Sequence, residues 1–298
     1  KTTVGKSLLE LKSLHNNIAD LIYVYLVNNS KELVGVVSFR ELVFADEDML
    51  IEEVMIQNPI SVNVKTDQEE AARLIKQYEL LALPVVSDSN KLIGQATVTD
   101  ALDVIQQELA EDFSQSFGAG AEENIFTPIK RSLSMRLPWI SVNLILAFIV
   151  SYTVAQFQDS ISSNALLAVL MPVVALVGGN SGAQSLAIVI RALAKNDISD
   201  ARVSEVIAKQ SLIGFLNGIF VALMSMVILF VIDLSSYAIP LGVAVLFNIF
   251  IGNFSGATIP LLLRKLGFDP ALASNIFLTL ITDIVGFSGF LFVALLLL

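Results

Sequence analysis

The sequence predicts a multidomain protein with an α/β front part, a connecting helix and an all-α membrane part of five helices. Three observations lead to this fold class. Runs of twenty or more mostly apolar residues occur only after Pro138, and a helix needs about 20 such residues to cross a bilayer. Two stretches of the front part repeat in register. Residues 1–129 hold 21 acidic and nine basic side chains, which is typical of a soluble domain.

Composition excludes several classes of function. The chain has no cysteine, so disulfide frameworks, thiol catalysis and cysteine-based zinc sites are ruled out. A single histidine, His15, argues against a histidine-rich transition-metal site. The acidic front part repels nucleic acid and attracts cations, particularly divalent ones. The polar N-terminus carries no signal peptide, so we expect the front part to be cytoplasmic.

The first elements in chain order belong to a 59-residue repeat. Val27–Glu41 reads VNNSKELVGVVSFRE, and Val86–Asp100 reads VSDSNKLIGQATVTD. Each copy predicts a strand, a polar turn, a second strand with a glycine, and a helix that begins at Ser38 or Thr97. An amphipathic helix over Gln68–Glu79 precedes the second copy.

This order of elements resembles a pair of cystathionine-β-synthase (CBS) domains, over about residues 1–110. The resemblance implies a first domain at 1–50, already inside its first helix where the chain opens, and a second at 51–105. Two such copies normally pack as one pseudo-symmetric disc. CBS pairs often hold adenine nucleotides, which leaves ATP as a modulator at Thr97 and Asp100. No phosphate-cradling glycine loop is present, and Glu41 replaces the acid in the first copy.

The connecting segment, residues 100–130, is predicted to be a long helix followed by a Gly-Ala-Gly link at 118–120. Its acidic residues fall within about half of the helix circumference, and they are Asp100, Asp103, Glu108, Glu111 and Asp112. Leu102, Ile105, Leu109 and Phe113 lie on the other side. Crowded like charges repel unless something neutralises them. The alternative is an ordinary solvated acidic face.

The membrane part, residues 131–298, is predicted to have five spans at about 138–157, 165–190, 211–232, 239–261 and 271–297. Nine basic residues flank these spans on one side, and they are Lys130, Arg131, Arg136, Arg191, Lys195, Arg202, Lys209, Arg264 and Lys265. The opposite loops carry only Asp159 and Asp233. The positive-inside rule therefore places the front part in the cytoplasm and the C-terminus outside.

The second span contains the polar, glycine-rich stretch 178–184, which reads GGNSGAQ. We expect a break in the helix here that lines a water-filled pathway and presents Gly179 and Asn180 to it. The alternative is close helix packing through small residues.

The last span contains Asp283, the only acidic side chain inside the five spans. A carboxylate at membrane depth is by default a functional site. Asn275 and Thr279 precede it at spacings of four residues, so the three form one polar stripe. Side-chain oxygens and water suit a hard cation such as Mg2+. A proton relay or a structural hydrogen bond for Asp283 remains open, and Asn248, Asn253 and Ser255 of the fourth span are expected to face the same space.

Four motifs of the membrane part resemble the MgtE family of magnesium channels. They are Met-Pro-x5-Gly-Gly-Asn-x-Gly-x-Gln at 171–184, Arg-Ala-Leu-Ala at 191–194, Arg-Lys-Leu-Gly-x-Asp-Pro-Ala at 264–271 and Ser-Asn-x6-Thr-Asp at 274–283. That family also joins a CBS pair to five spans through a helix. Its members usually carry a superhelical acidic domain ahead of the CBS pair, and none is visible here.

The resemblance implies a homodimer in the lipid bilayer of the cell (inner) membrane, with a pore between its two membrane domains. It implies Asp283 as the selectivity site, Asn275 and Thr279 as conduit residues, and the connecting helix as a plug. Acids at the positions of Asp100, Glu108, Glu111 and Asp112 bind regulatory Mg2+ in the family, and Asp103 shares their face.

The function expected from the sequence is therefore Mg2+ uptake through a channel gated by cytoplasmic Mg2+, with no enzymatic activity. A proton- or sodium-coupled divalent cation transporter is the alternative. An intramembrane aspartyl protease needs two facing acids where the chain offers one, and a mere anchor does not need polar residues at membrane depth. The sequence leaves Mn2+, Co2+ and Ca2+ open beside Mg2+.

Overall fold

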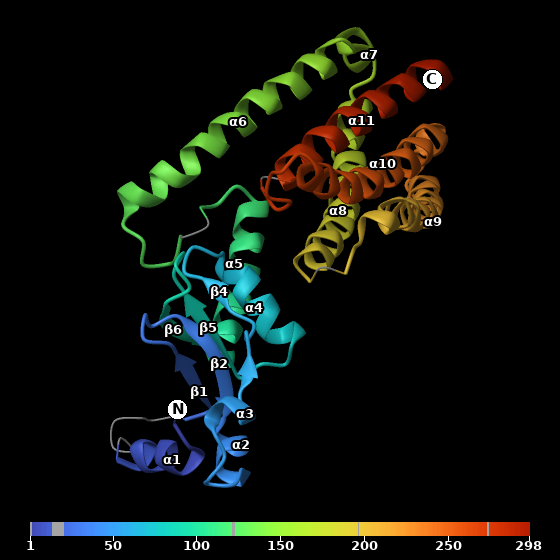
Figure 1. Cartoon of the computed structure of the whole chain (residues 1–298). Coiled ribbons are helices and arrows are strands. Elements are labelled where there is room, and N and C mark those ends of the chain that lie inside the picture. The colour runs from blue at the N-terminus through green and yellow to red at the C-terminus, as the bar shows by residue number, and fades with distance from the viewer. Residues whose placement is uncertain (1, 14–20, 121–122, 196, 273) are drawn as a thin grey trace. The chain divides into compact units, whose positions relative to one another are not determined.

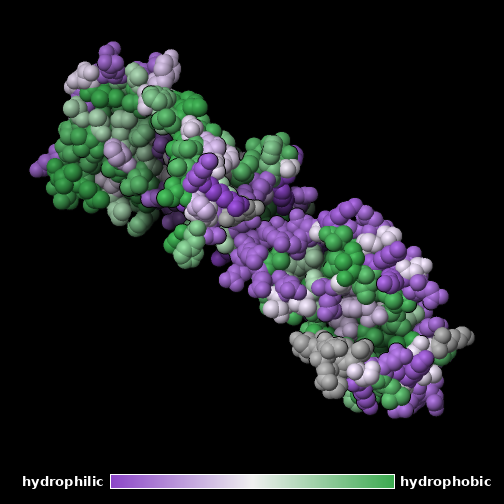
Figure 2. All heavy atoms as spheres, turned by 90° about the vertical axis from the view of Figure 1, so that its left-hand side faces the viewer, coloured by the Kyte–Doolittle hydropathy of each residue, from purple (hydrophilic) through white to green (hydrophobic). Residues whose placement is uncertain are grey.

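The computed structural model describes residues 2–13, 21–120, 123–195, 197–272 and 274–298 (Figure 1). His15 lies outside these residues. The chain divides into two compact units, residues 1–108 and 109–298. Hydrophobic surface gathers over the helical unit and hydrophilic surface over the strand-containing unit (Figure 2), as the composition of the two parts predicts.

Unit 1 contains two three-stranded sheets, with strand orders β1-β2-β3 and β4-β5-β6. Its strands are β1 Tyr23–Val27, β2 Leu33–Ser38, β3 Ile56–Gln57, β4 Val62–Asn63, β5 Ala82–Val86 and β6 Leu92–Thr97. Its helices are α1 Val4–Ser13, α2 Phe39–Phe44, α3 Ile51–Val54 and α4 Gln68–Gln77, and α5 Val98–Ser116 continues into unit 2. The expected α/β class is confirmed.

The 59-residue repeat is visible in the strand register. Tyr23 pairs with Ser38 at one end of the first hairpin, and Ala82 pairs with Thr97 at the same place in the second. Both hairpins shift register one residue before their turns. Lys31 and Asn90 hold the corresponding turn positions, with φ angles of 64° and 57°. The two copies therefore share backbone geometry as well as sequence.

The two hairpin turns also contact each other. The N–H of Leu33 donates to the carbonyl of Asn90 over 2.9 Å, and the N–H of Leu92 donates to the carbonyl of Lys31 over 3.1 Å. Leu33 and Leu92 are equivalent positions of the repeat, and so are Lys31 and Asn90. The two bonds are therefore equivalent to each other, and the copies meet about a pseudo-two-fold axis.

The helix that follows each hairpin begins with the same cap. The Ser38 hydroxyl accepts from the N–H of Glu41, whose carboxylate accepts from the N–H of Ser38. Thr97 and Asp100 exchange the same pair of bonds at the start of α5. Glu41 therefore preserves the cap rather than breaking the pattern. The helices then differ in length, since α2 has six residues and α5 has 19.

Unit 2 is helical, and five helices in its described residues are long and apolar enough to cross a membrane. The unit comprises α6 Ile129–Ala155, α7 Gln158–Ser163, α8 Leu166–Ala194, α9 Val203–Val231, α10 Ala238–Lys265 and α11 Ser274–Leu297. The short α7 was not predicted. Several helices extend past the expected spans on the basic side, and α6 begins nine residues before Pro138, which lies inside it. Hydropathy marks the apolar part of a helix and misses turns that continue into water.

The core of unit 2 forms around α10, which packs against α8, α9 and α11. In an apolar segment of 18 residues within α10, 61% of the residues are buried. In the corresponding apolar segment of α6, none are buried. Leu241, Val245 and Ile249 of α10 meet Val174 of α8 and Phe290 of α11 in the largest apolar cluster. Helix α6 packs against α11 and leaves most of its apolar surface uncovered in the single chain.

Candidate functional site

Asp283 lies in the middle of α11 and is half-buried. It is the only charged residue of that helix. Within the described part of the chain, its carboxylate forms neither a hydrogen bond nor an ion pair. A carboxylate at this depth without a protein partner needs water or a cation to stabilise its charge.

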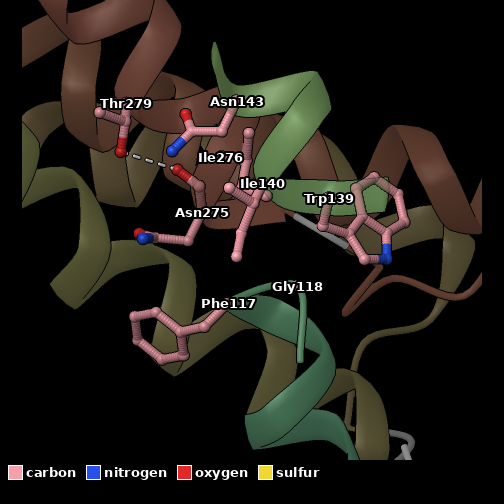
Figure 3. A pocket seen from close by; sticks show the side chains of 8 residues that line it. All are labelled: Phe117, Gly118, Trp139, Ile140, Asn143, Asn275, Ile276 and Thr279. Carbon is pink, nitrogen blue, oxygen red and sulfur yellow. Dashed lines mark hydrogen bonds between the residues drawn. The ribbon is translucent and has the colours of Figure 1, made fainter. Parts of the chain in front are cut away.

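Asn275 and Thr279 lie on the same helix, one and two turns before Asp283, as predicted. The Thr279 hydroxyl donates to the backbone carbonyl of Asn275 over 2.9 Å (Figure 3). This bond leaves the hydroxyl oxygen able to accept, and leaves the side-chain amide of Asn275 without a partner among the described residues. Thr282 differs, because it is fully buried and its hydroxyl donates to the carbonyls of Leu278 and Thr279.

A pocket of about 180 Å³ opens beside Asn275 and Thr279. It is lined from three segments by Phe117, Gly118, Trp139, Ile140, Asn143, Asn275, Ile276 and Thr279 (Figure 3). Sequence reasoning identified Asn275 and Thr279 and missed the other lining residues, including Asn143 of α6 and the chain at 117–118. The available signal for Asn143 was an amide side chain within an otherwise apolar part of the first span.

Gly118 ends helix α5 and lines one wall of this pocket. Its φ angle is +73°, and its N–H donates to the carbonyl of Gln115 over 2.9 Å while the N–H of Ala119 reaches the carbonyl of Ser114 over 3.0 Å. These bonds form a Schellman helix end. A Cβ on residue 118 would lie 3.0 Å from both Trp139 Cβ and Ile276 Cδ1, so both the positive φ angle and the tight space favour glycine here.

The glycine-rich stretch of the second span does not break the helix, contrary to the prediction. Helix α8 is continuous from Leu166 to Ala194. A Cβ on Gly182 would lie 2.8 Å from the carbonyl oxygen of Gly252, and one on Gly252 would lie 2.5 Å from that of Gly178. These glycines let α8 and α10 approach closely, which is the small-residue packing that was left as the alternative.

Gly179 and Asn180 lie differently from each other. A Cβ on Gly179 would lie 3.6 Å from the hydroxyl of Thr282, so this glycine faces the residue next to Asp283. Asn180 is exposed in the single chain and does not line the pocket. Its proposed place in a pathway therefore stays a prediction.

The fourth-span polar residues face the helix core rather than the pocket, which corrects the expectation. Asn248, Asn253 and Ser255 are at most 5% exposed. The Asn248 amide donates to the carbonyl of Val174 over 2.9 Å, and the Asn253 amide donates to the Ser181 hydroxyl over 2.7 Å. These groups serve as interhelical hydrogen bonds because hydrocarbon offers no other partner.

The five acidic residues predicted as regulatory all lie on α5. Glu108 accepts from the Gln68 amide over 2.8 Å, and Glu111 accepts from the Gln115 amide over 2.7 Å. No group of three acidic or histidine side chains in the described ranges is placed to hold a metal ion. The regulatory role stays a prediction.

Thr97 and Asp100, the predicted nucleotide contacts, bind each other. The backbone N–H and the hydroxyl of Thr97 both donate to one carboxylate oxygen of Asp100 over 2.7 Å. These bonds, the backbone one foremost, lower the pKa of the Asp100 carboxyl below its ordinary value. The pattern that resembles a nucleotide motif is thus accounted for as a helix cap.

Comparison with known proteins bears on the stripe and on the repeat. Residues 171–293, which include Asn275, Thr279 and Asp283, match the MgtE family, described as a divalent cation transporter. This part of the chain is an MgtE domain. Residues 51–107 match the CBS domain, so the resemblance drawn from the motifs is confirmed.

The MgtE domain and the part before it align together with longer relatives. The magnesium transporter MgtE of Enterococcus faecalis is 36% identical over 95% of this chain and 62% of its own length. That of Bacillus subtilis is 34% identical over 95% of this chain and 63% of its own. A solved cytosolic domain of the Mg2+ channel MgtE in complex with ATP is 38% identical, with a TM-score of 0.34, over 35% of this chain and 42% of that one. The chain thus spans less than two thirds of the length of these two transporters.

Proposed function

We propose that the protein is a Mg2+-selective channel of the cell membrane, with Asp283 as its selectivity site. The observation that carries this proposal is the unpartnered carboxylate of Asp283 on one stripe with Asn275 and Thr279. The relatives that align with nearly the whole chain are named magnesium transporters, which supports the choice of ion.

The proposed channel is a homodimer with its pore between two MgtE domains. Two facing carboxylates hold a hydrated divalent ion through water, whereas one monovalent ion leaves charge uncompensated. The exposed Asn180 supports a second copy, because this polar side chain is left uncovered in one chain. The basic flanks support a cytoplasmic CBS part and a C-terminus outside the membrane.

The proposed gate is α5 acting as a plug. Cytoplasmic Mg2+ neutralises the acidic face that contains Asp100, Asp103, Glu108, Glu111 and Asp112, and low Mg2+ lets repulsion open the pore. The test is magnesium-dependent protection of the front part from protease, compared between the wild type and the variant Glu108→Gln, Glu111→Gln, Asp112→Asn. A matched control neutralises Asp46, Glu47 and Asp48, which are exposed elsewhere. Protection should disappear only in the first variant, and protection that persists there counts against the gate.

ATP is proposed only as a modulator of the CBS part. Thr97 and Asp100 are engaged with each other in the helix cap, so a nucleotide would use other groups or displace that bond. Binding of ATP to the chain and to Thr97→Val, measured by calorimetry, distinguishes the two arrangements.

The experiment for the channel is divalent-cation flux into liposomes with Asp283→Asn, which keeps the shape of the side chain and removes its charge. Asp159→Asn, exposed on the short helix α7, is the control. Mg2+, Ca2+ and Co2+ are compared with and without a proton gradient. Gradient-independent Mg2+ flux whose selectivity is lost only in Asp283→Asn supports the channel. Flux that needs the gradient moves the assignment to a coupled transporter, and an unaffected variant places the filter elsewhere.

A further inference from the structure

Helix α6 carries one polar side chain whose position the packing of the single chain does not explain. Asn143 is exposed on the apolar part of this helix and forms no hydrogen bond with any described residue. Leu144, Ile145 and Phe148 around it are 59%, 62% and 67% exposed, as expected of a surface that faces lipid. An unpaired amide against hydrocarbon is unfavourable, because nothing there replaces its hydrogen bonds to water.

Two hydroxyl groups of the same helix, on either side of Asn143, are satisfied locally. Ser141 donates to the carbonyl of Leu137 over 2.8 Å, and Thr153 donates to the carbonyl of Ile149 over 2.9 Å. Such bonds let serine and threonine face lipid at low cost. Asn143 has no equivalent bond, so its amide needs a polar environment outside its own helix.

That environment is the pocket between α6 and α11. The Asn143 amide lies beside Thr279 and Asn275, and the ring of Phe117 lies across the space from it (Figure 3). Two unpartnered amides and a hydroxyl oxygen thus converge on a volume of about 180 Å³, which holds several water molecules. The stripe leads from Asn275 to Asp283, eight residues and about 12 Å along the helix axis.

We propose that Asn143 is an ion-contacting residue of the pathway, which binds the water shell of a divalent cation together with Asn275 and Thr279. An amide oxygen accepts hydrogen bonds from water polarised by the cation, and Mg2+ gives up its water reluctantly. Neutral groups serve this step well, because they hold the hydrated ion without adding a second charged trap beside Asp283. The inference rests on the proposed function and adds α6 to the helices that contact the ion.

Thiol labelling tests the placement of Asn143 independently of flux. The chain has no cysteine, so Asn143→Cys is the single site for a charged methanethiosulfonate reagent, which reaches only thiols in contact with water. Phe148→Cys, on the same helix and 67% exposed, is the control. We expect labelling of Asn143→Cys at least tenfold faster than that of Phe148→Cys, and slowed by millimolar Mg2+. Equal rates, or a rate that Mg2+ does not change, overturn the inference.

Flux measurements then separate this inference from the channel itself. Asn143→Leu should lower Mg2+ flux at least fivefold, and Asn143→Gln, which keeps the neutral amide, should retain flux, whereas Ser141→Ala should match the wild type. If Asp283→Asn loses selectivity for Mg2+ but Asn143→Leu has the Mg2+ flux of the wild type, the inference about Asn143 fails and the proposed channel function is retained. If the wild type conducts no Mg2+, the proposed function fails. Oxidative cross-linking of Asn143→Cys between two copies, without Mg2+ protection, would instead make it a contact between subunits and overturn its role with the ion.

Discussion

The side-chain amide of Asn253 donates a 2.7 Å hydrogen bond to the hydroxyl of Ser181, and both side chains are buried between α8 and α10. The Ser185 hydroxyl adds a 3.0 Å bond to the backbone carbonyl of Asn253. These contacts hold α8 and α10 together through polar groups that do not line the pocket. Polar residues in the MgtE domain therefore divide into those that join helices and those, such as Asn275, whose side chains bond no other described residue.

Replacing Asn253 with alanine should lower the free energy of unfolding by about 1–2 kcal/mol, because the Ser181 hydroxyl loses its partner in an apolar surrounding. Thermal unfolding in detergent measures the change. Thr258→Ala is the control, since its hydroxyl bonds only within its own helix, and its midpoint should move less. Equal shifts in the two variants would mean that the Asn253–Ser181 bond adds little.

Replacing Gly182 with alanine should separate α8 from α10. The new Cβ would lie 2.8 Å from the carbonyl oxygen of Gly252, where backbone must move to admit it. We expect a loss of about 1–3 kcal/mol. Gly289→Ala in α11 meets nothing within 4 Å and should be neutral or slightly stabilising, because alanine favours a helix. A Gly182→Ala chain as stable as Gly289→Ala would contradict the close crossing.

Replacing Gly118 with alanine should move the end of α5 away from Trp139 and Ile276, which a Cβ at this position would contact. Gly267 provides a matched control, since its φ of +80° imposes the same backbone strain with nothing within 4 Å of a Cβ. Strain at either site costs about 1–2 kcal/mol, and only Gly118→Ala adds a steric clash. Trp139 is the only tryptophan of the chain, so its fluorescence should shift in Gly118→Ala and stay unchanged in Gly267→Ala.

The cap between Thr97 and Asp100 should make the start of α5 sensitive to acid. The two bonds from Thr97 lower the pKa of Asp100 in the folded chain, so their stabilisation is fully present above the unfolded pKa, about 3.9. It is lost as pH falls through the lower folded pKa. Without Mg2+, Asp100→Asn should be less stable than the wild type at neutral pH, and this gap should narrow as the pH falls below the unfolded pKa. The exposed Asp103→Asn should show a much smaller gap, and a gap for Asp100→Asn that is independent of pH would exclude the carboxylate as its cause.

The repeat and the stripe from Asn275 to Asp283 could be predicted from the sequence because each rests on a regular spacing, and the five membrane helices could be predicted from their long apolar runs. The glycine-rich stretch of α8 was misread because a run of small residues permits both a break and a close crossing, and the partner helix decides between them. Asn143 was missed for the opposite reason. A single amide forms no repeating pattern in the sequence. Its place beside Asn275 and Thr279 becomes visible only when α6 packs against α11.

The unequal helices after the two hairpins have a consequence for the symmetry of the CBS part. In a pair with exact two-fold symmetry, the two copies are equivalent, and so are the helices that follow their hairpins. Here six residues follow the first hairpin and 19 follow the second, from the same cap. The two-fold symmetry therefore ends at α5, because only this helix continues along the chain toward the MgtE domain.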